Sequence, residues 1–179
     1  MFRKHYPHQR GNIMLKRIID DITVSLENNA YISALALALT IPDICGKAEY
    51  PNENGNKKRY LDWYETYIGV VYKNALSSDT TSMPYLSGEI IYSLRCSLLH
   101  QGTPNIEEKL GLQFSLICEP QKENGLYMDS AMIHNNHRNL AINIRGLCNV
   151  LTVSANAYYE KYPEKFDFFN YCLIRKLWC

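Results

Sequence analysis

Arg95 and His100 are the two residues of this sequence whose types and spacing could do chemistry. Arginine keeps its positive charge at physiological pH, and the histidine side chain titrates near neutrality. In metal-free cleavage of an RNA phosphodiester, a histidine moves protons while an arginine holds the non-bridging phosphate oxygens. The products would be a 2′,3′-cyclic phosphate and a 5′-hydroxyl. The pair therefore predicts a metal-independent endoribonuclease.

One helix is predicted to carry both residues. Ser87 suits an N-cap, and Glu89 in the first turn complements the positive end of the helix dipole. Gly102, followed by Pro104, is typical of a helix end. The helix is therefore expected to end just after His100.

The helical positions of the two residues predict how they meet. Successive residues advance by about 100°, which places Arg95 and His100 on either side of a face centred near Tyr92 and Cys96. One helix is predicted to hold the two groups apart, and two copies related by a two-fold axis to bring them into one cleft. Tyr92, Cys96 and Gln101 are the expected substrate-binding residues beside them.

Arg95 and His100 could also be ordinary surface residues of a helix, without a role in catalysis. Arginine and histidine are common on helix surfaces, and a short spacing pattern is weakly specific. A histidine near a helix C-terminus can simply complement the helix dipole. The longer sequence context is more specific than the pair.

The stretch from Tyr85 to Gly102 (YLSGEIIYSLRCSLLHQG) resembles the signature helix of the HEPN superfamily, which carries an arginine, four to six residues and then a histidine. Upstream, ALALALTIPDICG at 34–46 and RYLDWY at 59–64 resemble a group of uncharacterised bacterial HEPN-like proteins. The similarity covers most of residues 12–160.

This resemblance implies a homodimer with an RNA-cleaving cleft at its interface. Arg95 would bind the phosphate, and His100 would be the general acid or base. Active HEPN proteins often carry a polar residue directly after the arginine, whereas this chain has Cys96, and a neutral thiol is a poor donor and acceptor. The resemblance also implies a toxin–antitoxin, defence or RNA-processing role, with an antitoxin-type partner protein.

Composition narrows the class of protein. The 179 residues suit a single domain, 1–179, and 46% of them are apolar, which is enough for a hydrophobic core. The net charge of +1 argues against a generally basic nucleic-acid coat protein, although a local basic cleft is compatible with it. The cysteines form no Cys-x-x-Cys pair, so a zinc ribbon or a thioredoxin-like motif is not supported. No convincing carboxylate or His/Cys cluster is visible either, and no metal or cofactor is expected.

The location is predicted from the apolar segments. No apolar segment of the signal-peptide kind follows the polar, basic stretch Phe2–Arg10. The longest apolar run, Ile32–Ile41, is too short to cross a bilayer. We expect a cytoplasmic protein with reduced thiols and no membrane contact.

Apolar periodicity predicts the elements of the fold. Helices are expected over 12–28, 30–41, 60–72, 87–101 and 139–161, with a helical turn at 43–47 and a short helix from Pro163. Strand-like alternation over 112–118 and 126–134 predicts a small β-hairpin insertion at about 111–134. The predicted fold class is mainly α, an up-and-down HEPN-like bundle of four to five main helices with this insertion.

Other candidates are weaker. His134 and His137 have a spacing that could bind a metal on a helix, but a polar loop is the favoured interpretation because no third ligand lies near. Besides the ribonuclease, two functions stay open. One is a non-catalytic HEPN-like module that binds a nucleotide, RNA or a protein. The other is a plain helical interaction domain.

Overall fold

The computed structural model of the chain describes residues 12–72, 85–118, 129–134 and 137–169. These residues form a mainly helical structure, as predicted. The helices are α1 (Asn12–Glu27), α2 (Tyr31–Ala38), α3 (Ile41–Glu49), α4 (Asn56–Tyr67), α5 (Gly88–Gln101), α6 (Glu107–Leu110) and α7 (Ile144–Lys161), with 3₁₀ helices η1 (Gly69–Tyr72) and η2 (Pro163–Phe169). The strands are β1 (Gln113–Ile117), β2 (Ser130–His134) and β3 (His137–Asn143).

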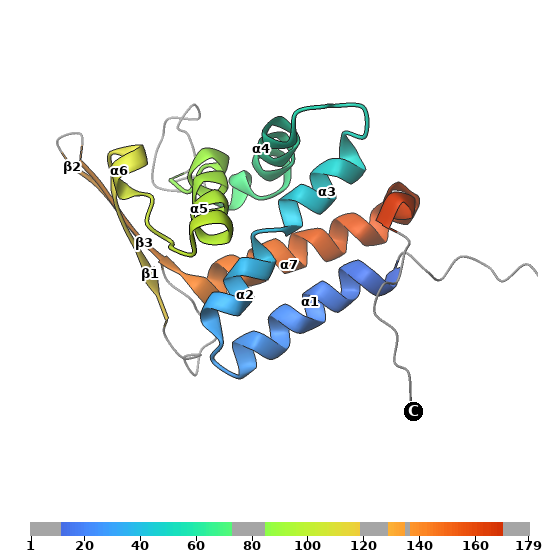
Figure 1. The fold of residues 1–179 in the computed structure, drawn as a ribbon, viewed down its shortest axis with the longest axis horizontal. Coiled ribbons are helices and arrows are strands. Elements are labelled where there is room, and N and C mark those ends of the chain that lie inside the picture. Colours follow the sequence, from blue (N-terminus) through green and yellow to red (C-terminus); the bar gives the residue numbers. More distant parts are fainter. Residues whose placement is uncertain (1–11, 73–84, 119–128, 135–136, 170–179) are drawn as a thin grey trace, which may run out of the picture.

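The helices pack as one bundle with the sheet at one end (Figure 1). α2 packs on α1 and on α7, and α3 packs on α4 and on α7. α5 packs against α4 and lies between α4 and the sheet in Figure 1. The candidate site residues on α5 therefore lie where the bundle meets the sheet.

The aromatic face of α4 holds α5 in place. Tyr60, Trp63 and Tyr64 are fully buried. The Tyr60 hydroxyl donates to the Leu39 carbonyl at 3.2 Å, and the Tyr64 hydroxyl donates to the Leu86 carbonyl at 3.0 Å. α4 thereby connects the end of α2 to the start of α5. The helix predicted over 60–72 begins earlier, at Asn56, and ends at Tyr67, with η1 completing it.

The predicted β-hairpin is wrong in its pairing. The sheet has the order β1-β3-β2, so β1 does not pair with β2. β1 pairs with β3 in parallel, and β2 pairs with β3 in the antiparallel sense. The missing element was β3, whose residues were assigned to a loop and to the start of a helix. Residues 126–128 of the predicted second strand lie outside the described residues, as does Phe2–Arg10.

The helix predicted from residue 139 begins instead at Ile144. Leu140 and Ile142 of β3 are buried, whereas Asn139 is exposed. Burial that repeats every second residue is typical of a strand. Asn143 then acts as the N-cap of α7, because its side chain accepts a hydrogen bond from the Gly146 N–H at 3.1 Å. His134 and His137, predicted to lie in a loop, end β2 and begin β3 and are partners in the register of these strands.

Asp129 joins this sheet to the entrance of α5. Its carboxylate accepts hydrogen bonds from the Tyr85 hydroxyl at 2.9 Å and from the Asn143 N–H at 2.7 Å. Tyr85 precedes α5, and Asn143 stands between β3 and α7. The two bonds therefore fix α5 relative to the sheet.

One stretch, Tyr31–Glu49, is long and apolar enough to cross a membrane by composition alone. It is longer than the apolar run noted in the sequence because α2 and α3 follow each other closely. Half of this stretch is buried inside the bundle. A buried core helix of a soluble protein can be equally long and apolar, so the stretch is weak evidence for a membrane span. Ala34, Leu35 and Ala38 of α2 form part of the shared core.

Candidate functional site

α5 carries all the predicted site residues, and both of its ends are well defined. Ser87 has the extended backbone of an N-cap, as predicted, but its side chain makes no capping bond. The Gly88 N–H is instead satisfied by Glu65 Oε1 of α4 at 2.5 Å. At the other end Gly102 adopts the left-handed conformation, with φ of 71°. α5 thus ends where the sequence predicted.

Arg95 and His100 meet within one chain, which corrects the prediction that one helix keeps them apart. Arg95 Nη1 lies 3.0 Å from His100 Nε2. The helical wheel places the two Cβ atoms about 140° apart, but it ignores side-chain length. The extended arginine side chain crosses the exposed face of α5 and reaches the imidazole. A second copy of the helix is therefore not needed to bring the two groups together.

Asp43 of α3 is a third member of this group, and the sequence analysis missed it. Its Oδ2 accepts a hydrogen bond from Arg95 Nε at 3.0 Å, and the two side chains are 28% and 22% exposed. Asp43 follows Pro42 in the first turn of α3, where an acidic residue also complements the helix dipole. Because an acidic residue is expected at this position of a helix, the sequence offered no reason to predict its contact with α5. The only signal in the sequence was that this acidic residue falls within 34–46, a stretch whose resemblance to a family was noted above.

The charges of this group are set by partial burial. Burial raises the pKa of the Asp43 carboxyl, and the charge and hydrogen bond of Arg95 offset part of that rise. Burial acts to lower the pKa of Arg95, but Asp43 and Cys96 outweigh it and raise that pKa overall. Arg95 therefore stays charged, with its Nε side occupied by Asp43 and an Nη group directed to His100.

Tyr92 and Cys96 lie along the same exposed face of α5. The Tyr92 ring meets the Tyr60 ring edge-on, with centroids 5.2 Å apart. Lys57 of α4 lies over Tyr92, with Nζ 5.6 Å from the ring centroid, and forms an ion pair of 2.9 Å with Glu89. Burial and the adjacent Cys96 thiol raise the pKa of the Tyr92 hydroxyl. Tyr92 is thus a packed residue of this face, with a positive charge beside it.

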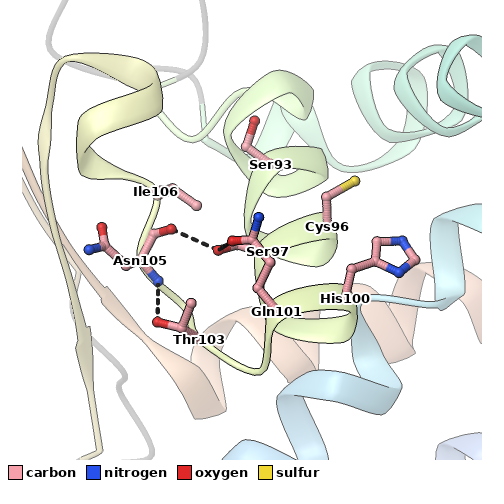
Figure 2. Close-up of a pocket in the computed structure, with 8 residues that line it drawn as sticks. All are labelled: Ser93, Cys96, Ser97, His100, Gln101, Thr103, Asn105 and Ile106. Carbon is pink, nitrogen blue, oxygen red and sulfur yellow. Dashed lines mark hydrogen bonds between the residues drawn. The ribbon is translucent and has the colours of Figure 1, made fainter.

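An open cavity of about 460 Å³ lies beside α5 (Figure 2). It is bounded by α5 and by the segment that turns back after Gly102. His100, Cys96 and Gln101 of the predicted site line it, whereas Arg95 and Tyr92 are not among its lining residues. The other lining residues are Ser93, Ser97, Thr103, Asn105 and Ile106.

A hydrogen bond between Ser97 and Asn105 holds the two walls of this cavity together. Ser97 Oγ donates to the Asn105 carbonyl at 2.7 Å and lies 3.3 Å from the Gln101 side-chain amide. Figure 2 shows this bond crossing from α5 to the returning segment. Thr103 Oγ1 accepts from the Asn105 N–H at 3.3 Å. The cavity is therefore a formed feature of the fold.

Metal ligands do not gather in the part of the chain that the structure describes. No group of at least three His, Cys, Asp or Glu side chains there is arranged to hold a metal ion. Because a guanidinium has no acceptor atom, Arg95 Nη1 donates in its contact with His100 and Nε2 accepts. The guanidinium can also donate to the oxygens of an anionic ligand, for which the Asp43 carboxylate competes.

Comparison with protein-family models, with curated proteins and with solved structures finds no match to this chain. The functional conclusion therefore depends on the geometry of α5 and its neighbours.

Proposed function

We propose that this chain is a HEPN-like, metal-independent endoribonuclease that acts as a homodimer, with Arg95 and His100 as catalytic residues. The observation that carries the proposal is the 3.0 Å contact between Arg95 Nη1 and His100 Nε2 on the exposed face of α5. The guanidinium can bind the oxygens of a phosphate, and the imidazole beside it can exchange protons with the reacting oxygens. Asp43 supports the proposal because it holds Nε and so orients the guanidinium toward His100.

The reaction follows from these groups. The ribose 2′-oxygen attacks the adjacent phosphorus, so that the bond from phosphorus to the 2′-oxygen forms and the bond to the 5′-oxygen breaks. A neutral imidazole takes the 2′-hydroxyl proton, and an imidazolium returns a proton to the departing 5′-oxygen. Arg95 stabilises the charge that develops on the non-bridging oxygens.

The need for both a proton acceptor and a proton donor supports the homodimer. Among the described residues, the chain brings one imidazole to the site, that of His100, and a two-fold axis beside α5 would supply a second. Leu99 supports the same interface, because it is 38% exposed on α5 directly beside His100. An exposed leucine is stabilised when a second copy covers it.

A non-catalytic HEPN-like module that binds a nucleotide, RNA or a protein at the same cleft is the second candidate. Two observations favour it. Asp43 already neutralises Arg95 at 3.0 Å, so a phosphate must compete with a carboxylate. The half-exposed Cys96 also stands after Arg95, where the resemblance leads us to expect a polar residue.

One experiment separates the two candidates. Wild type, Arg95→Ala and His100→Ala are incubated with single-stranded RNA in EDTA, with Arg17→Ala on α1 as a matched control. If the chain is a ribonuclease, wild type should release products that end in 2′,3′-cyclic phosphate and 5′-hydroxyl. Both site variants should lose these products, and the control should keep them. Circular dichroism checks that each variant is folded. RNA binding without cleavage supports the module, and equal cleavage by all four proteins rejects the proposed site.

In this proposal the enzyme works in the cytoplasm in a toxin–antitoxin, defence or RNA-processing role, restrained by an antitoxin-type partner. Induced expression in a bacterial host should stop growth with wild type and not with His100→Ala. Equal growth with both proteins, at equal expression, would contradict the toxin role.

A further inference from the structure

The order of residues around α5 places the cavity next to the proposed phosphate site. Starting from the buried side and moving around the helix, Arg95 comes first, then the exposed Leu99 and Cys96, then His100, and last Ser97 and Gln101. His100 both contacts Arg95 and lines the cavity. A nucleotide whose phosphate lies at Arg95 and His100 therefore has the cavity directly beside it.

The lining of the cavity is chemically different from the phosphate site. Among the described residues that line it, all but His100 carry neutral side chains, and most of these offer hydroxyl or amide groups. Neutral hydroxyl and amide side chains contact both phosphates and bases, but sequence is read only through hydrogen bonds and apolar contacts to the base. A lining of neutral hydrogen-bonding groups with an apolar contact therefore suits a base placed beside the phosphate. The buried Ile106 supplies the apolar contact. A volume of about 460 Å³ also falls within the range of small-molecule pockets.

Gln101 supplies the polar edge that could read a base. The Ser97 hydroxyl has one proton, and its 2.7 Å contact with the Asn105 carbonyl uses it. In the structure Gln101 Oε1 is the atom that lies 3.3 Å from Ser97 Oγ, so once the hydroxyl proton is used this contact is a hydrogen bond only if Nε2 takes the place of Oε1 and donates. A half-turn of the amide achieves this. Gln101 then presents its carbonyl oxygen and its second N–H toward the cavity.

We infer that this cavity is a nucleobase pocket, and that Gln101 makes cleavage selective for the base next to the scissile phosphate. This inference rests on the proposed ribonuclease function. An amide edge with an acceptor beside a donor pairs with two atoms of a base, as glutamine does with adenine in nucleic-acid complexes. The substrate is single-stranded RNA, because the base must leave its stack to enter a pocket.

The test uses oligonucleotides with one ribonucleotide in a deoxyribonucleotide background, so that each has a single cleavable bond. Each of the four bases is placed in turn on either side of that bond, and kcat/KM is measured in EDTA. Wild type should prefer one base on one side by about 10- to 100-fold. Gln101→Ala should reduce this ratio to below about 3-fold. Gln113→Ala, an exposed glutamine on β1 outside the cavity, should keep it.

Gln101→Glu provides a second variant of nearly the same size. It offers only acceptors when ionised, so the preferred base should change to one that presents an amino group. Cleavage by wild type without any base preference, or an unchanged preference in both Gln101 variants, overturns the inference and leaves the ribonuclease standing.

A binding measurement separates failure of the pocket from failure of the ribonuclease. All-deoxy oligonucleotides cannot be cut by this mechanism, and their Kd is measured by fluorescence anisotropy. Base-selective binding that Gln101→Ala abolishes upholds the pocket even if RNA is never cleaved. If there is neither cleavage nor base-selective binding, both the pocket and the ribonuclease are rejected.

Discussion

Asp43 of α3 and Arg95 of α5 form an ion pair although they are 52 positions apart in the chain. Oδ2 of the aspartate lies 3.0 Å from Nε of the arginine. This contact fixes the plane of the guanidinium, because Nε and the Nη groups belong to one rigid unit. The other edge of the same guanidinium then faces His100. The position of α3 therefore determines the orientation of the Arg95 guanidinium relative to His100.

Removal of the Asp43 carboxylate should weaken cleavage through the position of Arg95. We expect Asp43→Ala to lower kcat/KM on RNA by about 10²-fold, because small displacements of a catalytic group have effects of that size. Asp43→Asn keeps an oxygen that can accept from Nε and should recover most of the activity. If Asp43→Ala changes only the melting temperature, or if Asp43→Asn does not recover activity, Asp43 does not position Arg95.

Leu99→Glu should disrupt the proposed dimer. A carboxylate buried at Leu99 in the proposed dimer is costly, so the variant should elute as a monomer and lose cleavage together with its dimer. Val153→Glu is the matched control, since Val153 is 68% exposed on α7, away from the α5 face. The measurement is molar mass by light scattering during size-exclusion chromatography. A wild-type monomer that cleaves RNA would contradict the dimer.

Glu49 should make stability depend on acid pH. Burial alone would raise the pKa of Glu49, but hydrogen bonds from Lys165 and Tyr158 lower it below the ordinary value of 4.5. Lys165 Nζ lies 2.5 Å from Glu49 Oε2, which connects η2 to the end of α3. A carboxyl whose pKa is lowered by folding stabilises the fold above its unfolded pKa, and that contribution is lost as pH falls through the folded pKa.

Glu49→Gln tests this directly. At pH 7 it should cost about 1 to 2 kcal/mol of unfolding free energy, because hydrogen bonds to a charged group are lost or weakened. The difference from wild type should shrink below pH of about 4.5 and vanish once the folded carboxyl is protonated. Urea unfolding at several pH values measures it, with Glu27→Gln on α1 as the control. A difference that does not change with pH would contradict the prediction.

Replacing Gly102 by another residue should lower the stability of the protein, because the new residue must adopt a strained backbone conformation. The φ of Gly102, 71°, is left-handed, and a Cβ added there would meet nothing within 4 Å. Gly102→Ala should therefore destabilise the protein by about 1 kcal/mol through the backbone alone. Gly102→Asn should cost less, because asparagine adopts this conformation more readily. Thermal unfolding measures both variants, and equal melting temperatures for wild type and Gly102→Ala would refute the argument.

The sequence predicted α5 well because its signals are local. Ser87 and Gly102 bracket an apolar stripe of helical period, and both lie at the predicted ends. The same holds for α1, where residues 12–28 were predicted and Asn12–Glu27 is helical. Repeated apolar spacing and end residues are properties of the chain itself, so they can be recognised before any packing is known.

The sheet could not be predicted in the same way. The alternation of β3 at Leu140 and Ile142 joins the apolar stripe of α7 without a clear break. Whether such a segment is a strand depends on a partner far along the chain, here β1 in parallel. Without β3, the pattern predicts that the first two strands pair with each other, whereas in the structure β3 lies between them.

The sequence by itself determined which helix carries Arg95 and His100, where that helix ends, and that its apolar stripe faces a core. Only the tertiary structure decided that these two side chains touch, that Asp43 holds the arginine, and that the chain returns at Asn105 to form a cavity. Helix ends and faces follow from residues within one or two turns of each other. The reach of a long side chain and the neighbours it meets are decided by elements that folding brings together.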